Sequence, residues 1–197
     1  MERMFWGQFP VGRVFALMYY QPDTLAPTLI HRIKYYQDAD AGCRLAQQLL
    51  VTLARTTFFK GIDAIVPIPL NQQRERVRSF NQSLSIAQGV AALTQLPVWH
   101  TVVERHSNNP SQTQVSALER RHNVEGVFRV LAAEQLLGKH LLIVDDVMTT
   151  GSTISSCARA LVAAGAVRIS VLTLAVSVKL PFPHIAYTEA ARSLAKG

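Results

Sequence analysis

Two adjacent carboxylates are followed in the sequence by a small turn that is rich in hydroxyl groups. Asp145 and Asp146 come directly after the apolar residues 141–144, and residues 149–153 read TTGST. Carboxylates accept hydrogen bonds from sugar hydroxyls, whereas hydroxyl side chains and backbone N–H groups at the start of a helix bind phosphate. Together they predict a site for a phosphorylated ribose. The alternative is a solvated carboxylate pair beside an ordinary helix N-cap.

The elements around this segment indicate how it is positioned. Residues 141–144 (LLIV) are typical of a buried strand. Residues 152–164 predict a helix that Gly165 ends, and residues 167–176 predict the next strand. In open α/β sheets ligands bind at the carboxyl ends of strands, where this order places the carboxylates. Gly151 lets the backbone approach a ligand closely. Neither the GxxxxGK motif of nucleoside triphosphatases nor the GxGxxG motif of dehydrogenases is present, so the sequence does not favour either class of enzyme.

The rest of the chain alternates between strand and helix patterns. Strands are expected at 11–20, 62–66 and 98–103, with a weaker one at 124–130, and helices from Pro27, over 41–58 and over 80–93. Pro67 and Pro69 cannot donate ladder hydrogen bonds, so the strand before them should stop near Val66. This alternation predicts an α/β fold with a mainly parallel sheet flanked by helices, in which 141–144 is a central strand. The expected division is a small N-terminal hood over 1–60, a core over 61–180 and a tail over 181–197.

Composition and charge narrow the class of partner. Of the 197 residues 49% are hydrophobic and 17% are charged, so the chain can bury a core. A formal net charge of +7 favours anionic partners such as nucleotides or nucleic acids. No apolar stretch is long enough for a membrane span, no secretory signal is recognisable, and Cys43 and Cys157 are expected to be reduced thiols. These features predict a cytoplasmic protein without a structural metal.

The segment LLIVDDVMTTGST resembles the phosphoribosyl pyrophosphate signature of type I phosphoribosyltransferases. The resemblance implies that Asp145 and Asp146 hold the ribose hydroxyls. It also implies that the 5′-phosphate is bound by Thr149, Thr150, Gly151, Ser152 and Thr153. In such a site Mg²⁺ accompanies the pyrophosphate donor and keeps several waters, so no direct metal ligand from the protein is required.

Three further segments, IVPIPL, RERVRSFNQS and SQTQVSALERRHNVEGVF, resemble the ComF-like group of this family, which includes the GntX proteins. This resemblance covers roughly residues 14–180. It implies a pyrophosphate loop with Pro69, Leu70, Asn71 and Arg74. Ser79 stands where the group usually has glycine, and serine adopts a positive φ less readily than glycine. The four-cysteine zinc module with which members commonly begin is not recognisable in this sequence, so its role is not carried over.

The polar stretch 105–121 lies where such enzymes have a mobile loop that closes over the reacting centre. The matching positions are Gln112, Arg120 and Asn123. Closure would exclude water and bring positive charge to the departing pyrophosphate, which implies a catalytic role for Arg120 beside Asp145 and Asp146. The alternative is an ordinary surface loop.

A dense cationic patch lies beside the expected pyrophosphate loop. Arg74, Arg76 and Arg78 alternate along it. They are suited to neutralise pyrophosphate or to contact a nucleic-acid backbone, and a solvated basic face is the alternative to both.

Two functions follow from these features. The first is a phosphoribosyltransferase that binds phosphoribosyl pyrophosphate or a nucleoside monophosphate and transfers phosphoribosyl to an acceptor that the sequence does not identify. The second, implied by the resemblance to ComF, is a factor for DNA uptake or utilisation that binds single-stranded DNA and uses the phosphoribosyl site as a sensor. A regulator whose enzymatic activity is lost is a third reading, and an oligomer is compatible with each.

Overall fold

Four parallel strands form the central sheet of the computed structural model, which describes residues 1–21, 24–35, 40–70, 80–106 and 127–177. The strands are β1 (Val11–Tyr19), β2 (Ala64–Pro67), β5 (His140–Met148) and β6 (Arg168–Val176), in the order β1-β6-β5-β2. Every neighbouring pair is parallel. The α/β fold with a parallel sheet that the sequence predicts is confirmed.

Strand β5 is an interior strand, paired with β6 on one side and with β2 on the other. Leu141 and Ile143 pack into one layer of the core, whereas Leu142 and Val144 pack into the other. A strand covered on both faces needs apolar side chains in succession, which the sequence LLIV supplies. The central position predicted for this strand is confirmed.

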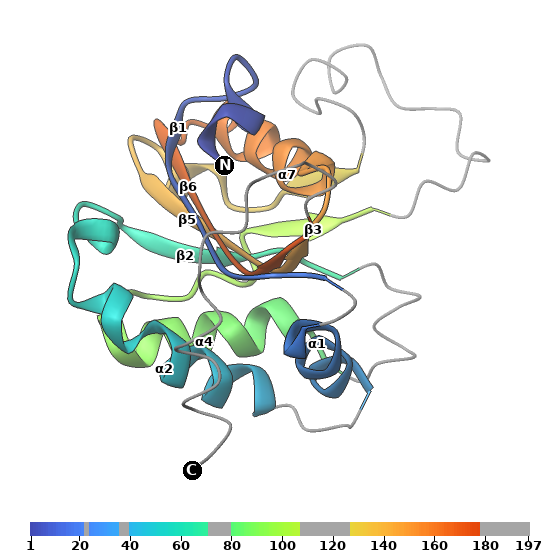
Figure 1. The fold of residues 1–197 in the computed structure, drawn as a ribbon. Coiled ribbons are helices and arrows are strands. Elements are labelled where there is room, and N and C mark those ends of the chain that lie inside the picture. The colour runs from blue at the N-terminus through green and yellow to red at the C-terminus, as the bar shows by residue number, and fades with distance from the viewer. Residues whose placement is uncertain (22–23, 36–39, 71–79, 107–126, 178–197) are drawn as a thin grey trace.

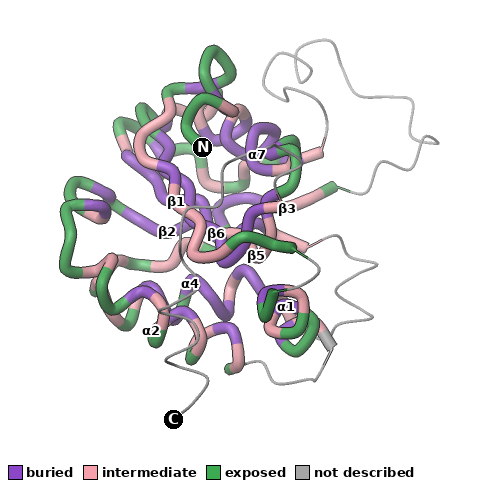
Figure 2. The backbone as a smooth tube through the Cα atoms, viewed as in Figure 1, coloured by how far each residue is buried: buried purple, intermediate pink, exposed green. Residues whose placement is uncertain are grey.

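Helices cover both faces of the sheet (Figure 1). Helix α7 (Ser152–Ala163) and the short 3₁₀ helix η1 (Glu2–Phe5) lie on one face. Helices α1 (Leu25–Tyr35), α2 (Ala41–Ala54) and α4 (Gln82–Thr94) lie on the other. Figure 2 shows the buried residues concentrated along the strands and the inward sides of the helices. Within the described ranges no helix is both long and apolar enough to cross a membrane.

The prolines make strand β2 much shorter than β5. Its last residue is Pro67, one residue beyond the predicted end near Val66. Pro67 is the last residue in register, opposite Val144, and the N–H of Ile68 donates to the Val144 carbonyl at 3.0 Å. Pro69 has no N–H with which to continue the ladder. Strand β5 runs on to Met148 with β6 as its partner, and is therefore longer than the predicted 141–144. Beyond Val144, no described strand pairs with β5 on the side where β2 lies.

The strand predicted over 98–103 is wrong. Val98 makes a single parallel bridge with Ile65. The strand in this part of the chain is β3 (Val103–Arg105), which pairs with β4 (Phe128–Val130) in a separate antiparallel ribbon. The strand begins at Val103 and not at Val98 because its partner β4, which belongs to the predicted weak strand over 124–130, lies opposite Val103–Arg105.

Two short helices complete the described elements. The helix predicted over 41–58 ends at Ala54, and the side chain of Thr56 then caps the 3₁₀ helix η2 (Thr57–Phe59). Helix α6 (Ala133–Leu136) leads into β5. Capping by Thr56 offers the backbone an alternative to continuing the longer helix.

The N-terminal part of the chain joins the same sheet. Strand β1 pairs with β6, and the Arg13 guanidinium donates hydrogen bonds to the carbonyls of Thr57 and Lys60. The division into a hood over 1–60 and a core over 61–180 stays a prediction. The predicted tail over 181–197 lies outside the described residues.

Helices α2 and α4 approach closely at Gly89. A Cβ atom there would lie 2.4 Å from the carbonyl oxygen of Cys43 and 2.8 Å from the Cβ of Ala46. We expect Gly89→Ala to force the helices apart and to lower the free energy of unfolding by about 1–3 kcal/mol, although alanine favours helix. The control Gln88→Ala, at an exposed position of α4, should change it by less than about 0.5 kcal/mol. Urea denaturation measures both, and a fully stable Gly89→Ala protein would contradict this packing.

Candidate functional site

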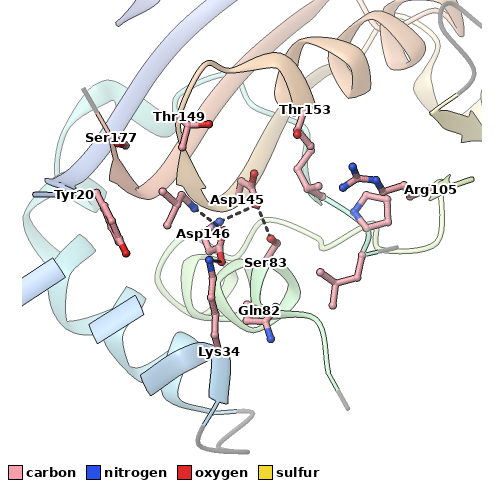
Figure 3. Close-up of a pocket in the computed structure, with 14 residues that line it drawn as sticks. Tyr20, Lys34, Gln82, Ser83, Arg105, Asp145, Asp146, Thr149, Thr153 and Ser177 are labelled. Atoms are coloured by element: carbon pink, nitrogen blue, oxygen red, sulfur yellow. Dashed lines mark hydrogen bonds and ion pairs between the residues drawn. The ribbon is translucent and has the colours of Figure 1, made fainter. Parts of the chain in front are cut away.

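A cavity of about 370 Å³ opens at the carboxyl ends of the four parallel strands (Figure 3). Each strand contributes to its lining: Tyr20 follows β1, Ile68 follows β2, Asp145 lies in the last part of β5 and Ser177 follows β6. Helices α1 and α4 and the turn before α7 complete the wall with polar side chains. The pocket therefore forms where ligands bind in open α/β sheets.

The two carboxylates in the pocket have different partners. The ammonium of Lys34, from α1, lies 2.9 Å from Oδ2 of Asp146, and Oδ1 of Asp146 accepts the N–H of Val147 at 2.6 Å. Oδ1 of Asp145 accepts the hydroxyl of Ser83 at 3.0 Å and the N–H of Asp146 at 2.9 Å. Asp146 is therefore paired with a cation, whereas the groups that bind Asp145 are neutral.

These surroundings set the pKa of Asp145. Burial of the carboxyl group, with the negative charge of Asp146 beside it, raises the pKa of Asp145 to about 7. The hydrogen bonds from the Asp146 N–H and the Ser83 hydroxyl, together with the charge of Lys34, oppose this rise in pKa. A carboxyl group that titrates near neutrality and lies in a pocket is typical of functional sites.

The N-terminus of α4 connects the end of β2 to the carboxylates. Asn81 is the N-cap of α4, and its side-chain oxygen accepts the N–H groups of Ser83 at 3.0 Å and Leu84 at 3.4 Å. The side-chain amide of Asn81 donates to the carbonyl of Ile68 at 3.0 Å. A cap of this kind fixes the first turn of a helix. Ser83 is thereby held where its hydroxyl reaches Asp145.

The predicted phosphate turn lies between β5 and α7. Gly151, the N-cap of α7, has φ = 76°, a left-handed conformation that favours glycine. A Cβ atom at this position would lie 2.9 Å from the ring of Phe5, which belongs to η1 and is fully buried. Glycine has no side chain with which to cap α7. The N–H of Ser152 donates to the Thr150 hydroxyl at 3.4 Å, and the next N–H groups of the first turn can donate to an anion.

Arg105, the last residue of β3, brings positive charge to another side of the pocket. Its guanidinium carbon lies 5.6 Å from the centre of the Phe128 ring, a contact that restrains the side chain. Figure 3 shows Arg105 and Lys34 on different sides of the carboxylates. The described pocket thus combines two cations, two carboxylates and several hydroxyl groups.

The structure brings part of the predicted site together. The predicted residues that line the pocket are Pro69, Leu70, Asp145, Asp146, Thr149 and Thr153. Those that share the turn without lining the cavity are Thr150, Gly151 and Ser152. The hydroxyl of Thr150 instead donates to that of Ser152 at 3.1 Å. The predicted residues outside the described ranges are Asn71, Arg74, Arg76, Arg78, Gln112, Arg120 and Asn123.

Several lining residues were missed by the sequence reasoning. Tyr20 and Ser177 directly follow two parallel strands, so the strand-end rule applied to Asp145 could have found them. Ser83 adjoins the FNQ segment that resembles the ComF-like group. Lys34 has no such signal, because nothing in the sequence indicates that α1 directs this lysine toward β5.

The raised pKa of Asp145 predicts a pH-dependent stability. Between the ordinary value of 3.8 and the folded value of about 7, the folded protein keeps a proton that the unfolded chain has lost. The contribution of Asp145 to the free energy of unfolding therefore falls as the pH rises through this window. Asp145→Asn cannot ionise, so we expect it to match the wild type near about pH 4 and to exceed it by roughly 1–3 kcal/mol at about pH 8.

Chemical denaturation across this pH range measures the difference between the two proteins. Glu134→Gln, at an exposed position of α6, is the control and should show no such trend. A difference between Asp145→Asn and the wild type that does not vary with pH would contradict the raised pKa.

Comparison with known proteins agrees with this geometry. The sequence matches the phosphoribosyl transferase domain family over residues 81–187. It is 34% identical over 168 residues to the DNA utilization protein YhgH of Escherichia coli K12, which covers 84% of this chain and 72% of that protein. It is 30% identical over 151 residues to competence protein F of Haemophilus influenzae, which covers 75% of this chain and 66% of that protein.

Among solved structures, the allosteric regulatory enzyme of purine biosynthesis superposes on 73% of the chain with a TM-score of 0.50 and 19% identity. The chain spans 30% of the length of that enzyme, so this likeness concerns the fold alone. The match over residues 81–187 contains the carboxylates, the turn and α4, and the relatives extend the similarity over most of the remaining sequence. The chain therefore belongs to the phosphoribosyl transferase domain family, and within it to the ComF-like group.

Proposed function

We propose that the pocket binds phosphoribosyl pyrophosphate and that the protein transfers its phosphoribosyl group to an acceptor. The observation that carries this proposal is the convergence of two carboxylates from β5 with a turn that opens α7, in one pocket at the ends of the strands. The proposal includes a cytoplasmic location, which the free thiols of Cys43 and Cys157 support.

Each part of the donor has a matching part of the pocket. The turn over residues 149–153 would hold the 5′-phosphate through hydroxyl groups and the N–H groups of α7, where the helix dipole adds positive potential. Asp145 and Asp146 would accept hydrogen bonds from the ribose hydroxyls. Arg105, which Figure 3 shows on a different side of the carboxylates from Lys34, would face the pyrophosphate. Pro69, which follows β2 and also lines the pocket, would contact it as well. The proposal also assigns Leu70, Asn71 and Arg74 to the pyrophosphate; the last two lie outside the described residues.

The transfer breaks the bond between C1 of the ribose and the pyrophosphate oxygen, which leaves with the electron pair. A lone pair of the acceptor forms the new bond to C1, and the proton that the acceptor loses passes to solvent. Positive charge develops on the ribose ring in the transition state, and the nearby carboxylates stabilise it. Closure of the loop that contains Arg120 would bring positive charge to the departing pyrophosphate.

Mg²⁺ is the cofactor that suits this chemistry. Within the described ranges, no group of three or more His, Cys, Asp or Glu side chains could hold a metal ion by itself. Asp145 and Asp146 are oxygen ligands of the kind that Mg²⁺ accepts, together with phosphate oxygens and water. The ion would be held mainly by the donor, with these carboxylates nearest, and would neutralise negative charge on the pyrophosphate.

Neutralising either carboxylate should weaken donor binding. We expect Asp145→Asn and Asp146→Asn each to lower the affinity for phosphoribosyl pyrophosphate about tenfold to hundredfold, because a charge-assisted hydrogen bond contributes roughly 1.5–3 kcal/mol. Calorimetry at about pH 8, where Asp145 is ionised, measures this. Glu134→Gln, on α6 and exposed, is the matched control and should bind like the wild type. Unchanged affinity in both pocket variants would refute the assignment of the ribose site.

A second function is supported by the names of the relatives. They are a DNA utilization protein and competence proteins, and the net charge of +7 suits a polyanionic partner. We propose as the alternative a factor for DNA uptake or utilisation that binds single-stranded DNA and uses the phosphoribosyl site as a sensor. The cationic patch of Arg74, Arg76 and Arg78, which lies outside the described residues, is its proposed DNA contact.

This alternative predicts salt-dependent binding through the patch. Replacing Arg74, Arg76 and Arg78 together by alanine removes three phosphate contacts, so the slope of log K against log salt should become shallower by roughly two to three units. A salt titration of single-stranded DNA binding measures the slope.

A charge-matched control removes three exposed cations elsewhere, Arg55, Lys60 and Arg168. Its slope should stay close to that of the wild type. Equal slopes for the wild type and the patch variant would exclude the patch from DNA binding.

A further inference from the structure

One wall of the pocket carries polar groups that the proposed donor does not use. It consists of Tyr20, Lys34 and Ser177, and is called the lysine wall below. Figure 3 shows these three side chains on the side of the carboxylates away from Arg105. They come from the end of β1, from α1 and from the end of β6.

Hydrogen bonds at the strand ends fix two members of the lysine wall. The N–H of Tyr20 donates to the carbonyl of Val176 at 2.8 Å, and the N–H of Ser177 donates to the carbonyl of Met148 at 2.8 Å. The backbone at these two positions therefore continues the sheet, whereas the side chains line the pocket. The ring of Tyr20 offers a flat apolar face of the kind on which a heteroaromatic ring stacks.

Lys34 supplies the charge of this wall. Its side chain is 22% exposed, and its ammonium lies 2.9 Å from Asp146. An ammonium group has three N–H donors and no acceptor. One donor on Asp146 leaves further donors for a ligand atom, so Lys34 can keep its carboxylate partner and bind a second oxygen at the same time.

The opposite side of the pocket already suits the pyrophosphate. Arg105 provides positive charge there. Pro69 and Leu70, which follow β2, also line the pocket. With the pyrophosphate on the Arg105 side, the ring that receives the phosphoribosyl group approaches the ribose from the opposite side of the carboxylates. The lysine wall lies on that opposite side.

We propose that the lysine wall receives a planar heterocyclic acceptor and selects rings that present an oxo or carboxylate oxygen to Lys34 over rings that present an amino group. The inference rests on the proposed function and names the substrate class of its acceptor. An oxygen accepts a hydrogen bond from the ammonium, whereas an amino group would place N–H against N–H and leave both donors unpaired. Such mismatches are what make polar sites discriminate strongly between similar ligands.

Nucleoside 5′-monophosphates test this selection, because they carry the ring, the ribose and the phosphate together. Calorimetry on the full chain compares inosine with adenosine monophosphate, and uridine with cytidine monophosphate, which exchange an oxo for an amino group. Orotidine monophosphate adds a carboxylate arm. We expect wild type to bind the better oxo ligand at least about tenfold more tightly than its amino counterpart. Tighter binding of the orotidine than of the uridine nucleotide would identify the carboxylate as the preferred group.

Variants at Lys34 assign the preference to this residue. The quantity compared is the ratio of the affinity for an oxo ligand to the affinity for its amino counterpart. Lys34→Met should reduce this ratio to about threefold or less, and Lys34→Arg, which keeps N–H donors, should retain most of it. Lys60→Met removes the same charge at an exposed position after η2 and should leave the ratio unchanged. Ribose 5-phosphate, which has no heterocyclic base, measures any effect of Lys34 that acts through Asp146 alone.

The inference is overturned if Lys34→Met keeps the wild-type ratio, or if it weakens ribose 5-phosphate as much as the oxo nucleotides. A wild type that prefers amino rings would overturn it as well. In each case binding of phosphoribosyl pyrophosphate by wild type would leave the proposed function standing. If wild type binds neither that donor nor ribose 5-phosphate, the proposed function itself fails.

Discussion

The early end of β2 is the constraint on which the site depends. Pro67 and Pro69 stop the ladder opposite Val144, while β5 continues along β6 to Met148. A β2 of equal length would occupy the side of β5 on which the pocket opens. Because the ladder stops, polar groups can stand within a buried parallel sheet and still reach a ligand. The two prolines and the two carboxylates, far apart in sequence, thus act as one structural unit.

Placing two acidic groups side by side in such a position costs stability, and the neighbouring elements limit that cost. Lys34 offsets the charge of Asp146, and Ser83, fixed by the Asn81 cap, gives Asp145 a hydrogen bond. The remaining cost appears as the raised pKa of Asp145. Functional sites are commonly less stable than the same fold would be without them. In this pocket the lower stability accompanies a carboxyl group that can change its charge near neutral pH.

Sequence reasoning found the segments whose chemistry is local. The run from Leu141 to Gly151 combines an apolar strand, carboxylates and a turn glycine within a few residues, so strand, turn and helix could be predicted together. It failed where long-range pairing decides: Val98 makes one bridge and no strand, because the pairing with β4 begins further along the chain. Lys34 could not be found either, since its role depends on how α1 packs against the sheet, which its own sequence does not encode.

The contact between Phe5 and Gly151 links the start of the chain to the proposed phosphate turn. The Phe5 ring occupies the space that a side chain at position 151 would need. A side chain at position 151 would therefore need a smaller residue at position 5, and it would still have to adopt the left-handed backbone that favours glycine. In evolutionary terms we expect position 151 to stay glycine. The residues 1–9, which the sequence alone leaves unremarkable, are thus restrained by a turn 146 residues further along the chain, as counted from Phe5 to Gly151.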